Sequence, residues 1–215
     1  MQLNLTGIAR LGRMTLISLG LAAVSLSASH TALAQSADVV GVHYPPVIKV
    51  EGTNLTLNGT GISYRAVAKL YTVGLYVPQK SSKAEAIFAT GGPKQLRFVM
   101  LQGMRVDELG KVITKGIENN SSREQFFKLI PSIRIMGEQF SRIRRLNAGD
   151  YFAVEYVPKR GTMFFVNGQP AGLPLEDADF FPAVLRTWLG NRPTTQDLKD
   201  ALLDFKAPPV LDALQ

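Results

Sequence analysis

Apolar residues recur along the chain with two different periods, and the two periods fall in separate blocks. Segments that are rich in β-branched and aromatic residues and nearly alternate in polarity predict strands. These segments are residues 48–57 (a strand or a hairpin), 62–77, 95–102, 151–157, 162–166 and 169–175. The segment 62–77 is the strongest candidate because it contains no proline, and a glycine-rich turn is expected before it at 57–61.

Apolar residues at helical spacing predict helices between the two groups of strands and after the second group. The expected helical segments are residues 84–90, 107–118, 122–130, 135–146, 178–189 and 195–204. Ser122 and Gln125 fit a capping box, and Pro131 is expected to restart or kink the helix that they open. The dipeptide Asn167-Gly168 between two apolar runs predicts a tight hairpin. Strands followed by helices, then strands followed by helices, favour an α+β fold in which helices cover one face of an antiparallel sheet.

The N-terminal 34 residues have a pattern of their own. Arg10 and Arg13 precede an apolar run over residues 14–28, and Ala32-Leu33-Ala34 follows it. A basic start, a short apolar core and an A-x-A site are typical of a cleaved secretory signal. The run is shorter than the roughly 20 residues that a membrane span requires, so an uncleaved anchor is the weaker alternative. We therefore expect a cleaved signal peptide at 1–34, a single domain at 35–215 and a periplasmic protein.

Composition excludes several kinds of site. The chain has no cysteine and two histidines, of which only His43 lies beyond the predicted signal. A Ser-His-Asp triad and a multi-histidine metal site are therefore not expected, and no cofactor is implied. The formal net charge of +7 becomes +5 once Arg10 and Arg13 are removed. This excess leaves contact with an anionic membrane surface open, for example through Arg142, Arg144 and Arg145, whereas export makes nucleic acid an unexpected partner.

Several short motifs occur in an order and spacing that point to one family. They are Leu57-Asn58-Gly59-Thr60-Gly61, the run 67–77, Leu109-Gly110-Lys111, Gly116-Ile117, Asn119-Asn120, Gly149-Asp150, the run 158–162, Val166-Asn167-Gly168 and the run 180–190. With these motifs the chain resembles the bacterial, exported branch of the chalcone isomerase-like family over nearly all of residues 35–215. The resemblance implies an open-faced β-sandwich, that is, a long antiparallel sheet with a helical layer on one face and an apolar cleft between them.

The resemblance also implies where a site would lie. Plant members that cyclise chalcones carry an arginine, a threonine, a tyrosine and an asparagine in the cleft, and the corresponding positions here are Ser63, Tyr71, Leu109 and Gly116. A Ser or Thr near the C-terminal Leu-Gly matches Thr187. Most of the plant catalytic constellation is thus not retained, although Arg65 stands two residues after Ser63.

Alternation predicts that Ser63, Arg65, Lys69 and Tyr71 share one face of the long strand. If that face lines the cleft, Arg65 and Tyr71 would hold an acidic group and Lys69 would add a screened charge. The alternative is a solvated outer face, which antiparallel sheets often have.

The resulting hypothesis is a monomeric periplasmic protein that binds a small amphiphilic anion, such as a fatty acid or an aromatic acid, without catalysis. The candidate ligand-binding residues are Ser63, Arg65, Lys69, Tyr71 and Thr187. Two alternatives remain at this stage. One is an intramolecular lyase in which Arg65 stabilises an oxyanion, and the other is an envelope module that binds a protein partner.

Overall fold

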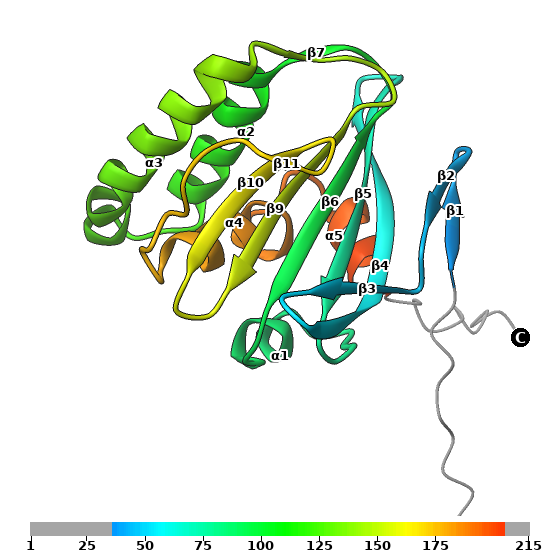
Figure 1. The fold of residues 1–215 in the computed structure, drawn as a ribbon, viewed down its shortest axis with the longest axis horizontal. Helices are drawn as coiled ribbons and strands as arrows, with labels where there is room; N and C mark the ends of the chain where they lie inside the picture. The colour runs from blue at the N-terminus through cyan, green and yellow to red at the C-terminus, as the bar shows by residue number, and fades with distance from the viewer. Residues whose placement is uncertain (1–35, 205–215) are drawn as a thin grey trace, which may run out of the picture. The chain divides into compact units, whose positions relative to one another are not determined.

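A seven-stranded antiparallel sheet organises the chain (Figure 1). The computed structural model describes residues 36–204. Along the sheet the strands follow the order β11-β10-β9-β6-β5-β4-β3. Their bounds are β3 Val47–Val50, β4 Thr53–Arg65, β5 Ala68–Val77, β6 Lys94–Met100, β9 Tyr151–Val157, β10 Gly161–Val166 and β11 Gln169–Pro170. Two further pairs, β1 (Ala37–Val39) with β2 (Val42–Tyr44) and β7 (Met104–Arg105) with β8 (Arg145–Leu146), lie outside this sheet.

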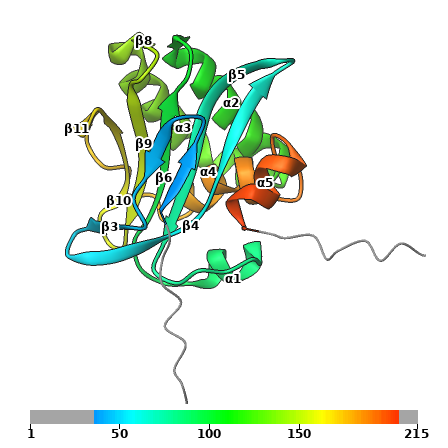
Figure 2. The same ribbon diagram turned by 90° about the vertical axis from the view of Figure 1, so that its right-hand side faces the viewer.

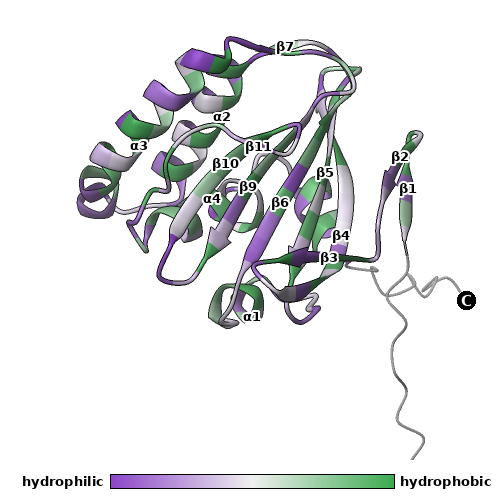
Figure 3. Cartoon of the chain, in the orientation of Figure 1, coloured by the Kyte–Doolittle hydropathy of each residue, from purple (hydrophilic) through white to green (hydrophobic). Residues whose placement is uncertain are grey.

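Helices cover one face of the sheet, so the α+β prediction is confirmed. They are α1 Ala84–Ala89, α2 Val106–Asn119, α3 Arg123–Ile143, α4 Phe180–Leu189 and α5 Gln196–Leu202. The main core lies between this layer and the sheet, where Phe98 and Phe152 from the strands pack with Ile113 of α2 and Trp188 of α4. Hydrophilic and hydrophobic residues are mixed along α3 (Figure 3), and its buried residues recur at helical spacing, as expected for a helix with one exposed side. Within residues 36–204, no helix is both long and apolar enough to cross a membrane.

The N-terminal hairpin β1–β2 lies against the opposite face of the sheet (Figure 2). Tyr44 fills the space above Gly74, where a Cβ would come within 2.7 Å of the tyrosine ring. The Tyr44 hydroxyl is hydrogen-bonded to Thr72 Oγ1 at 2.8 Å, and burial raises the pKa of Tyr44. Part of the outer face is therefore a second, smaller core rather than a wet surface.

The turn expected at residues 57–61 is wrong, because this segment runs inside β4. Its glycines serve close packing and not chain reversal. A Cβ on Gly61 would lie 2.5 Å from Leu198 Cδ1, and one on Gly59 would overlap the Ala201 carbonyl oxygen, since α5 lies directly on this strand.

The single strand expected at 62–77 is also wrong, because the chain reverses within it. The strand β4 ends at Arg65, and β5 begins at Ala68. Ala66 adopts a positive φ of 54° at this turn. Neither turn residue is Gly, Asn, Asp or Pro, so the sequence carries no turn signal here.

The helix α3 is continuous over 21 residues, with Pro131 in its interior. The helix therefore does not restart at Pro131, and the alternative of a kink stays a prediction. The capping box of Ser122 and Gln125 at its start is confirmed, as is the Asn167-Gly168 hairpin turn, where both residues have a positive φ.

Candidate functional site between the sheet and the helices

The four predicted site residues of β4 and β5 do not share one face. Ser63 pairs with Tyr71, but the next pair is Tyr64 with Lys69, so Leu70 is the extra residue of a β-bulge. Paired residues point the same way and successive residues alternate. Lys69 therefore points to the face opposite Tyr71, and the prediction that placed them together is wrong. The bulge leaves Leu70 packed on the helix-side core.

Arg65 stands at the exposed end of β4 and not inside a cleft. Its Nη2 lies 2.9 Å from Glu108 Oε2 on α2, and the side chain is largely exposed. The guanidinium already has a carboxylate partner in water, an arrangement typical of a surface ion pair. This contact does show that Arg65 lies on the helix side of the sheet.

Tyr71 points between the sheet and the helices, which is one of the two alternatives that the sequence left open, and aromatic side chains fill the space around it. The Trp188 Nε1–H donates to the Tyr71 hydroxyl at 3.4 Å, and Ser63 is the residue of β4 that pairs with Tyr71. Phe98 packs edge-on to Tyr71 at 5.4 Å and lies 5.1 Å from the Trp188 ring. Burial raises the pKa of Tyr71, although the polar groups of Ser63 and Trp188 lower it in part. The tyrosine is thus a neutral core residue.

Thr187 is completely buried on α4, facing α2. Its Oγ1 lies 3.5 Å from the Ile113 carbonyl oxygen, and a Cβ on Gly116 would overlap the threonine side chain. Leu109, another position that matches the plant site, is also fully buried. The structure therefore brings Ser63 and Tyr71 together, whereas Thr187 lies in the packed contact between α4 and α2. Tyr71 and Thr187 are both buried by this packing.

Another part of the same interface does contain an open pocket. It has a volume of about 370 Å³ and lies between the start of β6, the end of β9, α1 and α4. Its walls are apolar and aromatic: Phe88, Tyr156, Phe181, Pro182 and Leu185 are the principal side chains. Tyr156 and Phe181 stack at 5.2 Å between ring centroids. Pockets of this size and lining are typical of small-molecule sites.

Lys94 is the one strongly charged side chain that lines this pocket. It is the first residue of β6 and faces the helices together with Leu96 and Phe98. Only 6% of the residue is exposed, and the Nζ donates to the Thr90 carbonyl oxygen at 2.5 Å. No ion pair to Lys94 occurs within residues 36–204. Burial lowers the pKa of the Lys94 amine.

The ammonium of Lys94 can donate three hydrogen bonds, and one is used by the helix end. A carboxylate that entered the pocket could accept the others and supply the missing counter-charge. The arrangement thus suits an acid with an apolar body. The sequence analysis missed Lys94. Because side chains alternate along a strand, Lys94 lies on the same face of β6 as the core residues Leu96 and Phe98, and this spacing could have indicated a core-facing position.

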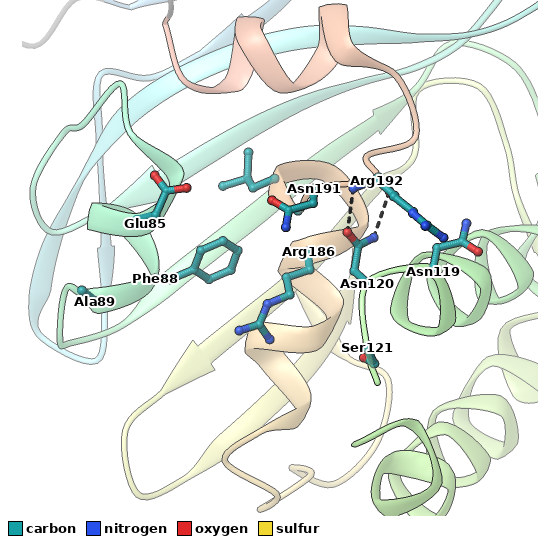
Figure 4. Close-up of a pocket in the computed structure, with 11 residues that line it drawn as sticks. Glu85, Phe88, Ala89, Asn119, Asn120, Ser121, Arg186, Asn191 and Arg192 are labelled. Carbon is teal, nitrogen blue, oxygen red and sulfur yellow. Dashed lines mark hydrogen bonds between the residues drawn. The ribbon is translucent and has the colours of Figure 1, made fainter. Parts of the chain in front are cut away.

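A second pocket, of about 820 Å³, adjoins Phe88 on the side of α2 and the end of α4 (Figure 4). Arg186 lies over the Phe88 ring at 5.1 Å. Asn120 is engaged by the backbone: its Nδ2 donates to the carbonyl oxygens of Gly116 and Arg192, and its Oδ1 accepts from Arg192 N. Asn120 of the Asn119-Asn120 motif therefore connects the end of α2 to the loop after α4 through hydrogen bonds.

Comparison with known proteins agrees with this architecture. A solved Arabidopsis thaliana fatty-acid binding protein has the same fold, with a TM-score of 0.61 at 12% sequence identity, over 79% of this chain and 96% of that one. No curated protein sequence shows significant similarity. The family model described as chalcone isomerase-like matches residues 36–204. The chain therefore belongs to the chalcone isomerase-like family.

Proposed function

We propose that the protein binds a small amphiphilic acid, without catalysis, in the pocket that Lys94 lines. The observation that carries this proposal is a buried ammonium, set in an apolar and aromatic pocket, that has no carboxylate partner among residues 36–204. A buried charge is costly unless it is paired, and a carboxylate ligand would pair it. The aromatic walls would hold the apolar body of the ligand.

The packing around Tyr71 favours binding over the isomerase alternative. Stabilising an enolate requires donors that converge on an accessible cavity. Here Tyr71, Thr187 and Trp188 are all buried, and the Trp188 Nε1–H already donates to the Tyr71 hydroxyl. The Arg65 guanidinium is paired with Glu108. The plant protein with this fold is named for fatty-acid binding, which is consistent with an acid ligand in a related scaffold.

The test is a matched pair of ligands, 3-phenylpropanoate and its neutral amide, titrated by calorimetry. We expect the acid to bind and the amide to bind at least tenfold more weakly, because only the acid supplies a counter-charge to Lys94. The Lys94→Met variant should bind the acid more weakly than the wild type by a similar factor. Lys83→Met is the control, since Lys83 is an exposed lysine beside the same helix. The proposal would be wrong if the acid and the amide bound with equal affinity, or if the wild type and Lys94→Met bound the acid with equal affinity.

The location of the protein is part of the same proposal. The predicted signal at residues 1–34 lies outside the described residues. Its basic start, apolar run and A-x-A site support cleavage after Ala34 and release into the periplasm. N-terminal sequencing of the protein from an envelope fraction tests this, and a chain that retains Met1 would contradict it.

A membrane contact is favoured by the tip of the β4–β5 hairpin. Val67 is 95% exposed there, beside exposed Tyr64, Arg65 and Lys69. Exposed apolar side chains next to basic ones suit an anionic bilayer surface. Vesicles containing phosphatidylglycerol should co-sediment the wild type more than Val67→Asp. The control Val47→Asp, at an exposed valine on β3, should behave like the wild type.

A further inference from the structure

An open groove runs between α2 and α3, on the outside of the helical layer. Its volume is about 570 Å³. The α3 side contributes Ile133, Met136, Gly137 and Phe140, and the α2 side contributes Gly110 and the stem of Thr114, so the floor is almost entirely apolar. Gly137 widens the groove, because a Cβ placed on it would meet nothing within 4 Å.

At one end the groove continues into a basic pocket. The two share Asp107, Phe140 and Ser141, and the second pocket adds Arg105, Arg144 and Arg145. The lining of this pocket therefore contains three arginines and one carboxylate. That carboxylate is already bonded to Arg105, whose Nε lies 2.8 Å from Asp107 Oδ1. Within residues 36–204, neither Arg144 nor Arg145 forms an ion pair.

The backbone places two of these arginines directly opposite each other. β7 pairs with β8 so that Arg105 faces Arg145. Like charges at directly opposed positions of an antiparallel pair are destabilising. The Arg145 guanidinium also lies against Gly103, where any Cβ would overlap it. An anion between the arginines would relieve this repulsion, and guanidinium groups suit carboxylate and phosphate oxygens.

The lysines along the groove are engaged differently. Lys111 lies 3.5 Å from Asp107 and Lys115 lies 2.9 Å from Glu118, so each already has a carboxylate on its own helix. The excess of positive charge is concentrated at the arginine end, while the rest of the groove offers an apolar floor.

We infer that the α2–α3 groove is a second binding site, for an amphiphile with an acyl chain and an anionic head. The chain would lie along Ile133, Met136 and Phe140, and the head would lie between Arg105, Arg144 and Arg145. This site goes beyond the proposed function, because no residue lines both it and the Lys94 pocket. The head could be a fatty-acid carboxylate or a lipid phosphate, which share the same recognition chemistry.

The test uses dodecanoate and dodecyl phosphate below their micellar concentrations, titrated into the purified protein by calorimetry. Dodecyltrimethylammonium carries the same chain with the opposite charge, and inorganic phosphate carries the head alone. We expect both dodecyl anions to bind at least tenfold more tightly than either control compound. The stronger of the two anions then identifies the head group.

Two variants locate the binding. Gly137→Leu should fill the groove and weaken both anions at least tenfold while the helix stays folded, since leucine is a better helix former than glycine. Arg145→Ala should weaken the anions without improving the cation. Lys128→Ala, an exposed site elsewhere on α3, is the control and should bind like the wild type.

Three outcomes would overturn the inference. They are binding of dodecyl anions that Gly137→Leu leaves unchanged, inorganic phosphate binding as tightly as dodecyl phosphate, or no measurable binding of either dodecyl anion by the folded wild type. Lys94→Met should remove only the dodecanoate that enters the Lys94 pocket, and it should leave unchanged the binding of dodecyl anions that depends on Gly137 and Arg145. A loss in Lys94→Met alone would assign these ligands to the Lys94 pocket, so the two proposals can fail separately.

Discussion

Lys94 lies on the face of β6 that also carries the core residues Leu96 and Phe98. Its ammonium is buried, and within the described part of the chain its one acceptor is the Thr90 carbonyl oxygen. Fixing a charge in such a place costs stability that an apolar residue of similar length would not cost. The residue therefore makes better sense as part of a site than as part of the scaffold.

Lys94→Met should raise the free energy of unfolding of the ligand-free protein by about 1–3 kcal/mol at neutral pH. The pKa of Lys94 is lowered in the folded state. Between the folded and the unfolded pKa values, the unfolded chain therefore binds more protons than the folded chain. The destabilisation caused by the buried ammonium thus becomes smaller as pH rises through that window. The advantage of Lys94→Met should thus shrink toward the ordinary lysine pKa near roughly 10.4. Urea titrations of both proteins at several pH values measure it, and an advantage that grows with pH would contradict the argument.

Gly116→Asn places the plant-type asparagine back on α2. Because a Cβ at Gly116 would overlap Thr187, we expect a loss of about 1–3 kcal/mol or more from overpacking and no isomerase activity. Thermal unfolding and a chalcone cyclisation assay check the two parts. A stable and active variant would show that this region can open.

At the scale of elements, α3 contains a feature that opposes its own helicity. Pro131 is exposed in the ninth position of this 21-residue helix, so it removes a backbone hydrogen bond without contributing to the core. The helix persists because Leu129, Met136 and Phe140 are anchored in the main core and because Ser122 and Gln125 cap its start.

Pro131→Ala should therefore stabilise the protein by about 1–3 kcal/mol, as expected for restoring a helix-interior hydrogen bond. Chemical denaturation measures the change. Ser122→Ala is the opposite control and should cost about 1 kcal/mol through loss of the cap. No gain from Pro131→Ala would indicate that the helix is bent to fit a proline.

The elements show what local pattern can and cannot reveal. The Asn167-Gly168 turn, the capping box and the amphipathic face of α2 are local signals, and each was predicted. The reversal at Ala66 and Val67 was not, because the turn is enforced by pairing between β4 and β5 and not by turn residues. The β-bulge at Leu70 followed from the same pairing, and it displaced Lys69 from the predicted site. Lys94 was missed because its burial depends partly on α4, which is distant in the sequence.

At the scale of the whole described chain, the sheet is held from both sides. The helical layer buries the main core, and β1–β2 buries Tyr44 and Tyr76 on the other face. Tyr76 donates to the Pro45 carbonyl oxygen at 3.0 Å, and burial raises its pKa to about 12. The N-terminal hairpin thus packs on the sheet and contributes to the stability of the fold.

Tyr44→Phe should cost about 1–3 kcal/mol, because it leaves the buried Thr72 hydroxyl without its side-chain partner. Tyr44→Ala should cost about 3–5 kcal/mol, since it also empties the space above Gly74. Differential scanning calorimetry of the two variants measures both losses. Unchanged melting temperatures would mean that the hairpin contributes nothing to stability.

The two ends of the sheet have a consequence for behaviour at high concentration. Free strand edges are templates for aggregation, and short strands or prolines blunt them. Here one edge is β3, with four residues, and the other is β11, with two residues that end in Pro170, which has no N–H to donate. These two terminal strands thus offer little for another copy to extend, so we expect copies of this protein to stay separate at high concentration. Light scattering over a wide concentration range should show a constant monomer mass.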